Sequence, residues 1–170
     1  MKKILFLLLV ALILISCNQQ KIGYVDNSKL INEYQEKIDN DASIQLKIQD
    51  FQRRTDSIRK AFQLEINDAE IKARKMSQSG RQELSKELQD KEQVLSQRLQ
   101  FEQTQINQEN RIKTDSLIKK VKEFVANYGK QNGYTFILGS NEAGSVMYGE
   151  EQYDLTELIL EALNTSYKDK

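Results

Sequence analysis

The chain has 170 residues, of which 39% are hydrophobic and 29% charged, and its formal net charge is zero. It has no histidine and no proline, and its one cysteine can form neither an intramolecular disulfide nor a cysteine-based zinc site. This composition excludes histidine-dependent catalysis and gives no argument for nucleic-acid binding. The absence of proline is compatible with very long helices, because proline costs about 3 kcal/mol in a helix interior.

Residues 1–16 are typical of a signal peptide. Two lysines precede the apolar run Ile4–Leu14, which is too short to span a bilayer as a helix, since spanning takes roughly 20 residues. Leu14-Ile15-Ser16-Cys17 resembles a bacterial lipobox, so we expect residues 17–20 to form a lipidated N-terminus anchored through Cys17. An ordinary signal peptide with an incidental cysteine, or an uncleaved anchor, is the alternative. The mature chain would lie outside the cytoplasm.

Residues 21–43 are expected to contain a strand and the start of a long helix. Lys21–Asp26 has strand-forming residues, and Asn27 or Ser28 can cap a helix that continues to about Met76. Apolar or small residues then recur at steps of three and four, the pattern of a coiled-coil seam. They are Ile44, Ile48, Phe51, Thr55, Ile58, Phe62, Ile66, Ala69, Ala73 and Met76. An amphipathic helix lying on a globule is the alternative, but a chain of this size could not cover so long a helix.

The segment 77–80 contains the only glycine between Gly23 and Gly129. We expect the chain to reverse there, with Gly80 in the left-handed conformation that ends helices. Two arms of nearly equal length, Ser28–Met76 and Arg81–Tyr128, would then form an antiparallel coiled-coil hairpin, with residues 44–128 as its arms. Asp39-Asn40-Asp41 is a weak helix former and is expected to break the first arm near its base.

The seam of this hairpin is expected to be only partly apolar. Polar residues fall at or beside seam positions, namely Lys91, Glu102, Gln103, Glu109 and Lys113. Such interruptions indicate arms that are weakly held together. A solvated face on an ordinary stable hairpin explains them equally well.

Residues 129–170 are expected to form further strands and a helix. Gly133–Leu138 and Val146–Tyr148 are typical of strands, and Asp154 with Glu157 has the spacing of a capping box for a helix ending near Asn164. The strands should join Lys21–Asp26 in a small sheet. The predicted fold class is therefore mainly α with a small β body, into which the hairpin is inserted. A body of about forty residues is near the size that needs oligomerisation.

The order of these segments resembles the Skp (OmpH) family of periplasmic chaperones. The resemblance covers nearly the whole mature chain and is carried by Lys21–Asp26, Tyr134–Leu138, Val146–Gly149 and Asp154–Asn164. It implies a homotrimer whose bodies associate at one end and whose hairpins enclose a cavity. It also implies that this cavity holds unfolded outer-membrane proteins without ATP or any cofactor, and that the chain has no catalytic residues.

Two features depart from the family pattern, whose members are soluble and strongly basic. This chain carries a lipobox, and its charge is near neutral. Residues 44–128 hold 17 basic and 13 acidic residues, whereas residues 129–170 hold 3 basic and 7 acidic residues. Mildly basic arms on an acidic body keep a weak form of the polarity that steers acidic clients.

The functional hypothesis is a holdase chaperone that is anchored to a membrane in the periplasm and contacts clients through its arms. The candidate contact residues are Arg53, Arg54, Arg59, Lys60, Phe62, Leu64 and Phe101. The basic clusters among them are equally compatible with solvated faces that pair with neighbouring acids. A lipid-tethered coiled-coil spacer or adaptor that binds a folded envelope partner is the second hypothesis. Enzymatic activity is disfavoured, because no phosphate loop, nucleophile elbow or metal-ligand spacing is present.

Overall fold

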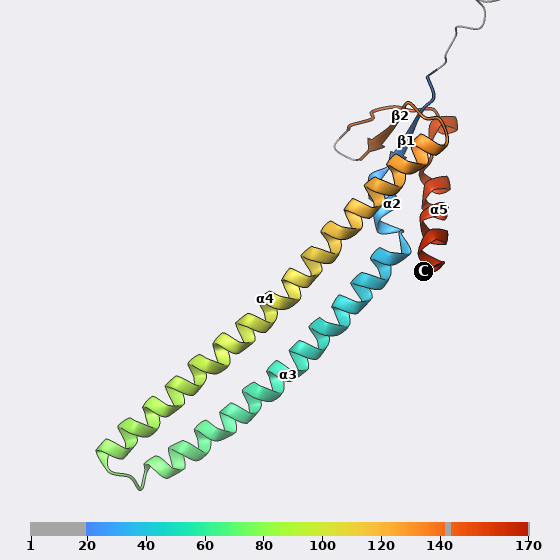
Figure 1. The fold of residues 1–170 in the computed structure, drawn as a ribbon. Helices are drawn as coiled ribbons and strands as arrows, with labels where there is room; N and C mark the ends of the chain where they lie inside the picture. The colour runs from blue at the N-terminus through green and yellow to red at the C-terminus, as the bar shows by residue number, and fades with distance from the viewer. Residues whose placement is uncertain (1–19, 142–143, 170) are drawn as a thin grey trace, which may run out of the picture. The chain divides into compact units, whose positions relative to one another are not determined.

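The structure is a computed structural model that describes residues 20–141 and 144–169. These residues form two compact units. The body combines the described residues up to Tyr34 with those from Lys119 onward, and the hairpin spans Gln35–Ile118 (Figure 1). The expected signal peptide and the lipidation site Cys17 lie outside the described residues. No helix within the described ranges is long and apolar enough to cross a membrane.

The hairpin is formed by two long antiparallel helices, α3 (Gln35–Ala73) and the hairpin part of α4 (Gln78–Gln131). The predicted break at residues 39–41 is wrong, because these residues lie inside α3. Side-chain contacts one helical turn apart, Gln35 with Asp39 at 2.8 Å and Lys37 with Asp41, compensate for the poor helix propensity there. The helical run is interrupted earlier, between α2 (Asn27–Asn32) and α3.

The chain reverses between α3 and α4 without using Gly80 as a left-handed residue. Gly80 lies in the first turn of α4, and the reversal occupies residues 74–77. Two backbone bonds of the i to i+3 type close this turn, from Lys75 to Lys72 and from Met76 to Ala73. Ser77 then caps α4, because its Oγ accepts a hydrogen bond from the Gly80 N–H at 3.3 Å. A serine cap therefore starts the second arm, and the predicted role of Gly80 is wrong.

The arms meet along an apolar seam of modest depth. Its best-buried cluster consists of Ile44, Phe51 and Ile106, against which Ile48 and Leu99 pack. Closer to the turn, Ala69 is also buried. The predicted seam positions of α3 thus do face α4, but many of them are only half-buried.

The body is built on a two-stranded parallel sheet. Strand β1 (Ile22–Asp26) pairs with β2 (Phe136–Ser140), with Ile22 opposite Phe136 and Tyr24 opposite Leu138. Since the strands lie on either side of the hairpin in the sequence, the sheet joins the segments that precede and follow the hairpin. The hairpin is therefore an insertion in the body, as the sequence predicted.

A glycine turn leads from α4 into β2. Gly133 has φ of +70°, a conformation that side chains disfavour. The Tyr134 N–H donates to the Gly129 carbonyl at 2.9 Å, which gives the hydrogen-bond pattern of a Schellman motif. This turn ends the helix at Gln131 and directs the chain back along β1.

The predicted strand Val146–Tyr148 is absent; Val146 and Met147 lie in bends, and Tyr148 has no regular secondary structure. The free side of β1 is taken instead by the residues before α5 (Thr156–Lys168). Tyr24 and Asp154 form an isolated parallel bridge, and the Leu155 N–H donates to the Tyr24 carbonyl at 2.9 Å. This leaves no edge of β1 on which residues 146–148 could pair.

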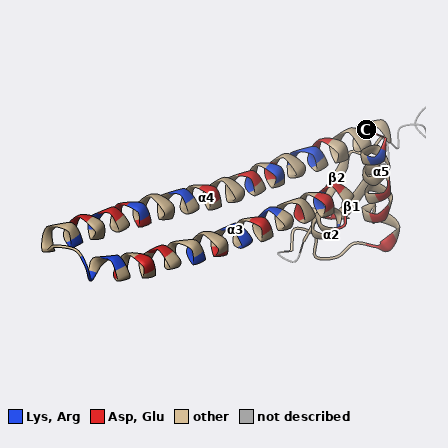
Figure 2. Cartoon of the chain, turned by 90° about the horizontal axis from the view of Figure 1, so that it is seen from below, with Lys and Arg blue, Asp and Glu red and all other residues tan. Residues whose placement is uncertain are grey.

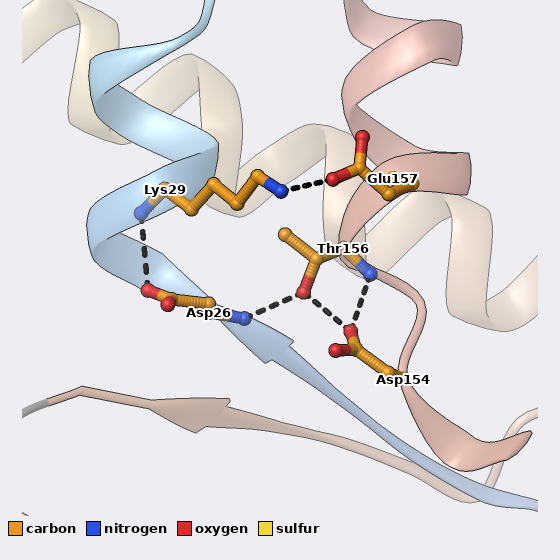
Figure 3. Close-up of polar contacts among 5 residues, drawn as sticks. All are labelled: Asp26, Lys29, Asp154, Thr156 and Glu157. Atoms are coloured by element: carbon orange, nitrogen blue, oxygen red, sulfur yellow. Dashed lines mark hydrogen bonds and ion pairs between the residues drawn. The ribbon is translucent and has the colours of Figure 1, made fainter. Parts of the chain in front are cut away.

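Side chains around the start of α5 hold it to β1 and α2 (Figure 3). The Asp154 Oδ1 accepts from the Thr156 N–H at 2.8 Å, and Thr156 Oγ1 accepts from the Asp26 N–H at 2.8 Å. The predicted capping box is wrong, because Leu155 rather than Asp154 stands at the N-cap of α5 and Glu157 pairs with Lys29 of α2. The helix continues past the predicted end at Asn164 to Lys168.

Candidate functional site

Three ion pairs join the arms of the hairpin, and all have the same antiparallel register. The pairs are Lys47 with Glu109 at 2.6 Å, Arg54 with Glu102 at 2.8 Å, and Glu65 with Lys91. On α3 the paired residues are separated by seven and then eleven positions. On α4 their partners follow in the reverse order with the same separations. Steps of seven and eleven return to nearly the same face of a helix. Lys91, Glu102 and Glu109, three of the predicted polar seam residues, are therefore cross-arm contacts. Gln103 instead donates to Asn107 on its own helix.

The pair nearest the body has a third member. Glu109 accepts hydrogen bonds from Lys47 and also lies 3.4 Å from Lys113 on its own helix. The hydrogen bond from Lys47, followed by that from Lys113, holds the pKa of Glu109 below its usual value. Lys113 also donates to Ser43 Oγ at 3.4 Å, which extends the network across the seam.

The predicted basic contact residues have different partners. Arg53 pairs with Asp50 on its own helix, whereas Arg54 belongs to the cross-arm row. Arg59 lines a groove between the arms whose wall includes the half-buried Phe62. Lys60 is exposed. The guanidinium group of Arg54 is thus already paired with Glu102.

Both signs of charge are spread along the hairpin. Figure 2 shows Lys and Arg alternating with Asp and Glu over the length of α3 and α4. In Figure 2, neither arm is coloured with one sign of charge alone along its length. Electrostatic attraction of an acidic partner to the arms is therefore weak and diffuse.

Large apolar side chains lie outside the seam on both arms. Leu64 and Phe101, which the sequence singled out, are each 65% exposed. Further exposed apolar residues share their helix faces, which gives an outer stripe of α3 and an outer stripe of α4. The stripes are Leu46, Leu64 and Ile71 on α3, and Val94, Phe101 and Ile112 on α4.

The spacing within each stripe places its members on one face. Leu46 and Leu64 are eighteen residues apart, which is five helical turns, and Ile71 follows seven residues later. The α4 stripe has steps of seven and eleven residues. Sequence reasoning missed Leu46, Ile71 and Val94, although this second periodicity, offset from the seam, could have identified them.

The hairpin surface places apolar and charged groups close together. Among residues 20–141 and 144–169, no group of three or more Asp, Glu, Cys or His side chains could hold a metal ion. A groove of about 850 Å³ near the base of the arms has Ile106 and Ile112 beside the charged residues of the cross-arm row. Apolar and charged groups therefore alternate over short distances along the hairpin.

The sheet of the body has an apolar outer face. Ile22, Phe136 and Leu138 alternate with inward-facing residues and are 42%, 55% and 45% exposed. The opposite face packs on α4, where Ile137 contacts Gly129. The outer face of this small sheet is therefore an exposed apolar patch.

Comparison with known proteins gave two findings. The sequence matches the family described as outer membrane protein (OmpH-like) over residues 21–163. The fold is similar to the crystal structure of a candidate outer membrane chaperone (OmpH-like) from Caulobacter crescentus, with a TM-score of 0.76. That likeness covers 86% of this chain and 85% of the other at 14% identity, so it concerns the fold alone. Comparison with curated proteins gave no match.

Proposed function

The chain belongs to the OmpH-like family of outer membrane proteins, and on that premise we propose that it is an ATP-independent holdase chaperone of the periplasm. In this proposal a homotrimer binds unfolded outer-membrane proteins in a cavity formed by its helical arms. The observation that carries the proposal is the pair of outer stripes on the hairpin. These stripes are exposed although the seam already satisfies the contact between the arms.

Exposed apolar stripes on a polar hairpin suit a partner without a fixed shape. Large apolar side chains such as Leu64 and Phe101 expose most of their surface, and single contacts of this kind are weak. Several weak contacts along one client nevertheless hold it by avidity, and each can be released without an energy source. A folded client, which has buried its own apolar groups, would no longer bind.

Basic residues beside the stripes would contribute a secondary attraction. Lys60 lies one helical turn before Leu64, so both project from the same face of α3. Arg53 and Arg59 are exposed as well. Arg54 contributes less, because Glu102 already binds its guanidinium group.

The proposal includes assembly and anchoring. The apolar outer face of the sheet, formed by Ile22, Phe136 and Leu138, supports a trimer made through the bodies. Lipidation of Cys17 would keep the assembly at a membrane. Neither step needs a catalytic residue.

Aggregation of a urea-unfolded β-barrel protein after dilution tests the proposal. Mature protein without its lipid should suppress light scattering at a near-stoichiometric ratio. The double variant Leu64→Gln with Phe101→Gln should lose much of this suppression, because it interrupts both stripes. The matched control is Ser57→Ala with Gln97→Ala, which changes two exposed polar residues of the same helices. Circular dichroism should show equal helix content in all three proteins.

Two outcomes would contradict the proposal. Mature protein that leaves aggregation unchanged is not a holdase. Capture of one folded envelope protein, with no preference for unfolded ones, would support the lipid-tethered spacer or adaptor instead. The mass in solution tests assembly separately, and a monomer at micromolar concentration would exclude the cavity.

A further inference from the structure

The body surface around the start of β1 forms a shallow groove. We call it the N-terminal face, and its residues are Gln20, Lys21, Ile22, Tyr134, Gln152 and Tyr153. Ile22 and Tyr153 are 42% and 47% exposed. The face therefore combines apolar, aromatic and polar groups at the point where the described chain begins.

Lys21 and Tyr134 form the best-defined contact of this face. The ammonium group of Lys21 lies 4.0 Å from the centre of the Tyr134 ring and donates to the Asn132 carbonyl at 3.0 Å. Lysine and tyrosine have apolar bodies and polar tips, and both are favoured at the boundary between lipid and water. Tyr153 adds a second exposed ring to the same groove.

The chain before the N-terminal face is short. The Lys21 carbonyl accepts from the Thr135 N–H at 2.7 Å, so the main chain is fixed to the body from this residue onward. Cys17 precedes Lys21 by four residues, and four residues span at most about 14 Å even when fully extended. Acyl chains on Cys17 would thus hold this face close to the bilayer surface, whatever path the connecting residues take.

We propose that the N-terminal face of the body docks on the lipid surface, with Tyr153 and the Lys21–Tyr134 pair at the headgroup level. The inference rests on the lipidation of Cys17 that the proposed function includes. Glu150 and Glu151 are exposed beside Gln152, so the face is not strongly basic. Docking therefore depends on the anchor and the amphipathic side chains, and the body is the part of the chain at the membrane.

Tryptophan fluorescence can test this orientation, because the chain has no tryptophan of its own. The first reporter variant is Tyr153→Trp. The second is Gln152→Trp, which replaces an exposed side chain and so should leave folding unaffected. The control variant is Thr165→Trp, an exposed site in the last turns of α5, at the opposite end of that helix from β1 (Figure 1). Each lipidated protein is reconstituted into phosphatidylcholine vesicles with either plain or brominated acyl chains.

The reporter variants should lose roughly half of their emission in brominated vesicles, with a blue shift on reconstitution, as expected for an interfacial tryptophan. The control variant should lose little. Equal quenching at all sites, or none at either reporter site, would overturn the docking.

Flotation of the same samples separates this failure from a failure of the anchor. If the lipidated protein does not float with vesicles, or if the Cys17→Ser variant floats equally well, the tether is wrong and the inference fails with it. Suppression of client aggregation is measured independently, so loss of the proposed function has its own readout.

Discussion

The body and the hairpin contain similar residue types but bury them to different extents. In the body, Leu30 and Ile159 have no exposed surface and Val25 is 2% exposed. In the much longer hairpin, Leu117 is 1% exposed, but Ile44, Phe51 and Ile106 are 5% to 9% exposed and most other seam residues are half-buried. Burial per residue is therefore concentrated in the body and diluted in the arms.

This difference shows how one short chain can combine a fixed base with adaptable arms. Local opening is easiest where few apolar contacts must be broken. The cross-arm row of ion pairs fixes the register of the arms, but exposed ion pairs add little stability. The arms should therefore open and close while the body stays folded, and substitutions in the two units should have separable effects.

The largest effect is expected from Ile159→Ala in the body. Removing a wholly buried isoleucine side chain should lower the free energy of unfolding by about 2–5 kcal/mol. Urea unfolding followed by circular dichroism measures this change. Leu158→Ala is the control, because the Leu158 side chain is next to Ile159 in the sequence but is 51% exposed. Its removal should lower the free energy of unfolding far less. Equal losses would show that α5 does not pack as described.

A smaller effect is expected from Ile106→Ala in the hairpin. The loss should fall near the lower end of the range for a buried isoleucine, about 2 kcal/mol, because two solvated helices can close over the gap. Hydrogen exchange should accelerate within residues 35–118 and stay unchanged in the body. Ile112→Ala, at a 59% exposed site, is the control. Equal acceleration of hydrogen exchange in the body would show that the two units do not open independently.

Acid should loosen the hairpin before the body. The pKa of Glu109 is lowered by hydrogen bonds from Lys47 and Lys113, so this carboxylate stabilises the folded arms above its unfolded pKa of about 4.5. That contribution is lost as the pH falls through the lower folded value. Hydrogen exchange between pH 6 and pH 3, on a scale corrected for intrinsic rates, should show it. In the Glu109→Gln variant, the exchange rate of the hairpin should depend less on pH. An unchanged pH dependence would show that Glu109 does not cause the effect.

Alkali should have the smallest effect, and it should act on the body. The pKa of Lys29 is raised by its hydrogen bond and charge pairing with Glu157. Its contribution is complete below the unfolded value of 10.5 and is lost as the pH rises through the higher folded value. Amide exchange is too fast there, so the thermal midpoint is the practical measurement. Glu157→Gln should reduce this dependence, whereas Glu109→Gln should leave it intact.

The sequence predicted the long elements well because they depend on local periodicity. The seam of α3, the strand at Lys21–Asp26 and the amphipathic helix near the C-terminus each follow from spacing alone. The errors concern competition between neighbours. Residues 146–148 have strand propensity, but they pair with neither strand, and Asp154 and Leu155 occupy the second edge of β1.

The candidate surface was predicted only in part for a similar reason. Leu64 and Phe101 were recognisable as apolar residues outside the seam. The stripes to which they belong follow a second apolar periodicity, which is overlaid on the periodicity of the seam. The pairing of Glu65 with Lys91 was not predictable from either helix alone. It depends on the register of the arms, which the seven- and eleven-residue steps on both helices fix together.

The parallel pairing of Ile22 with Phe136 also sets the order in which the molecule can be built. A polypeptide that emerges N-terminus first releases β1 long before its partner strand, since the whole of α3 and α4 must follow in between. The two arms need only each other and a tight turn, so they can pair while the rest of the chain is still emerging. Contacts between segments that are distant in the sequence, such as β1 with β2, form later. A product truncated after α4 would carry complete arms but an unpaired first strand, because β2 would be missing.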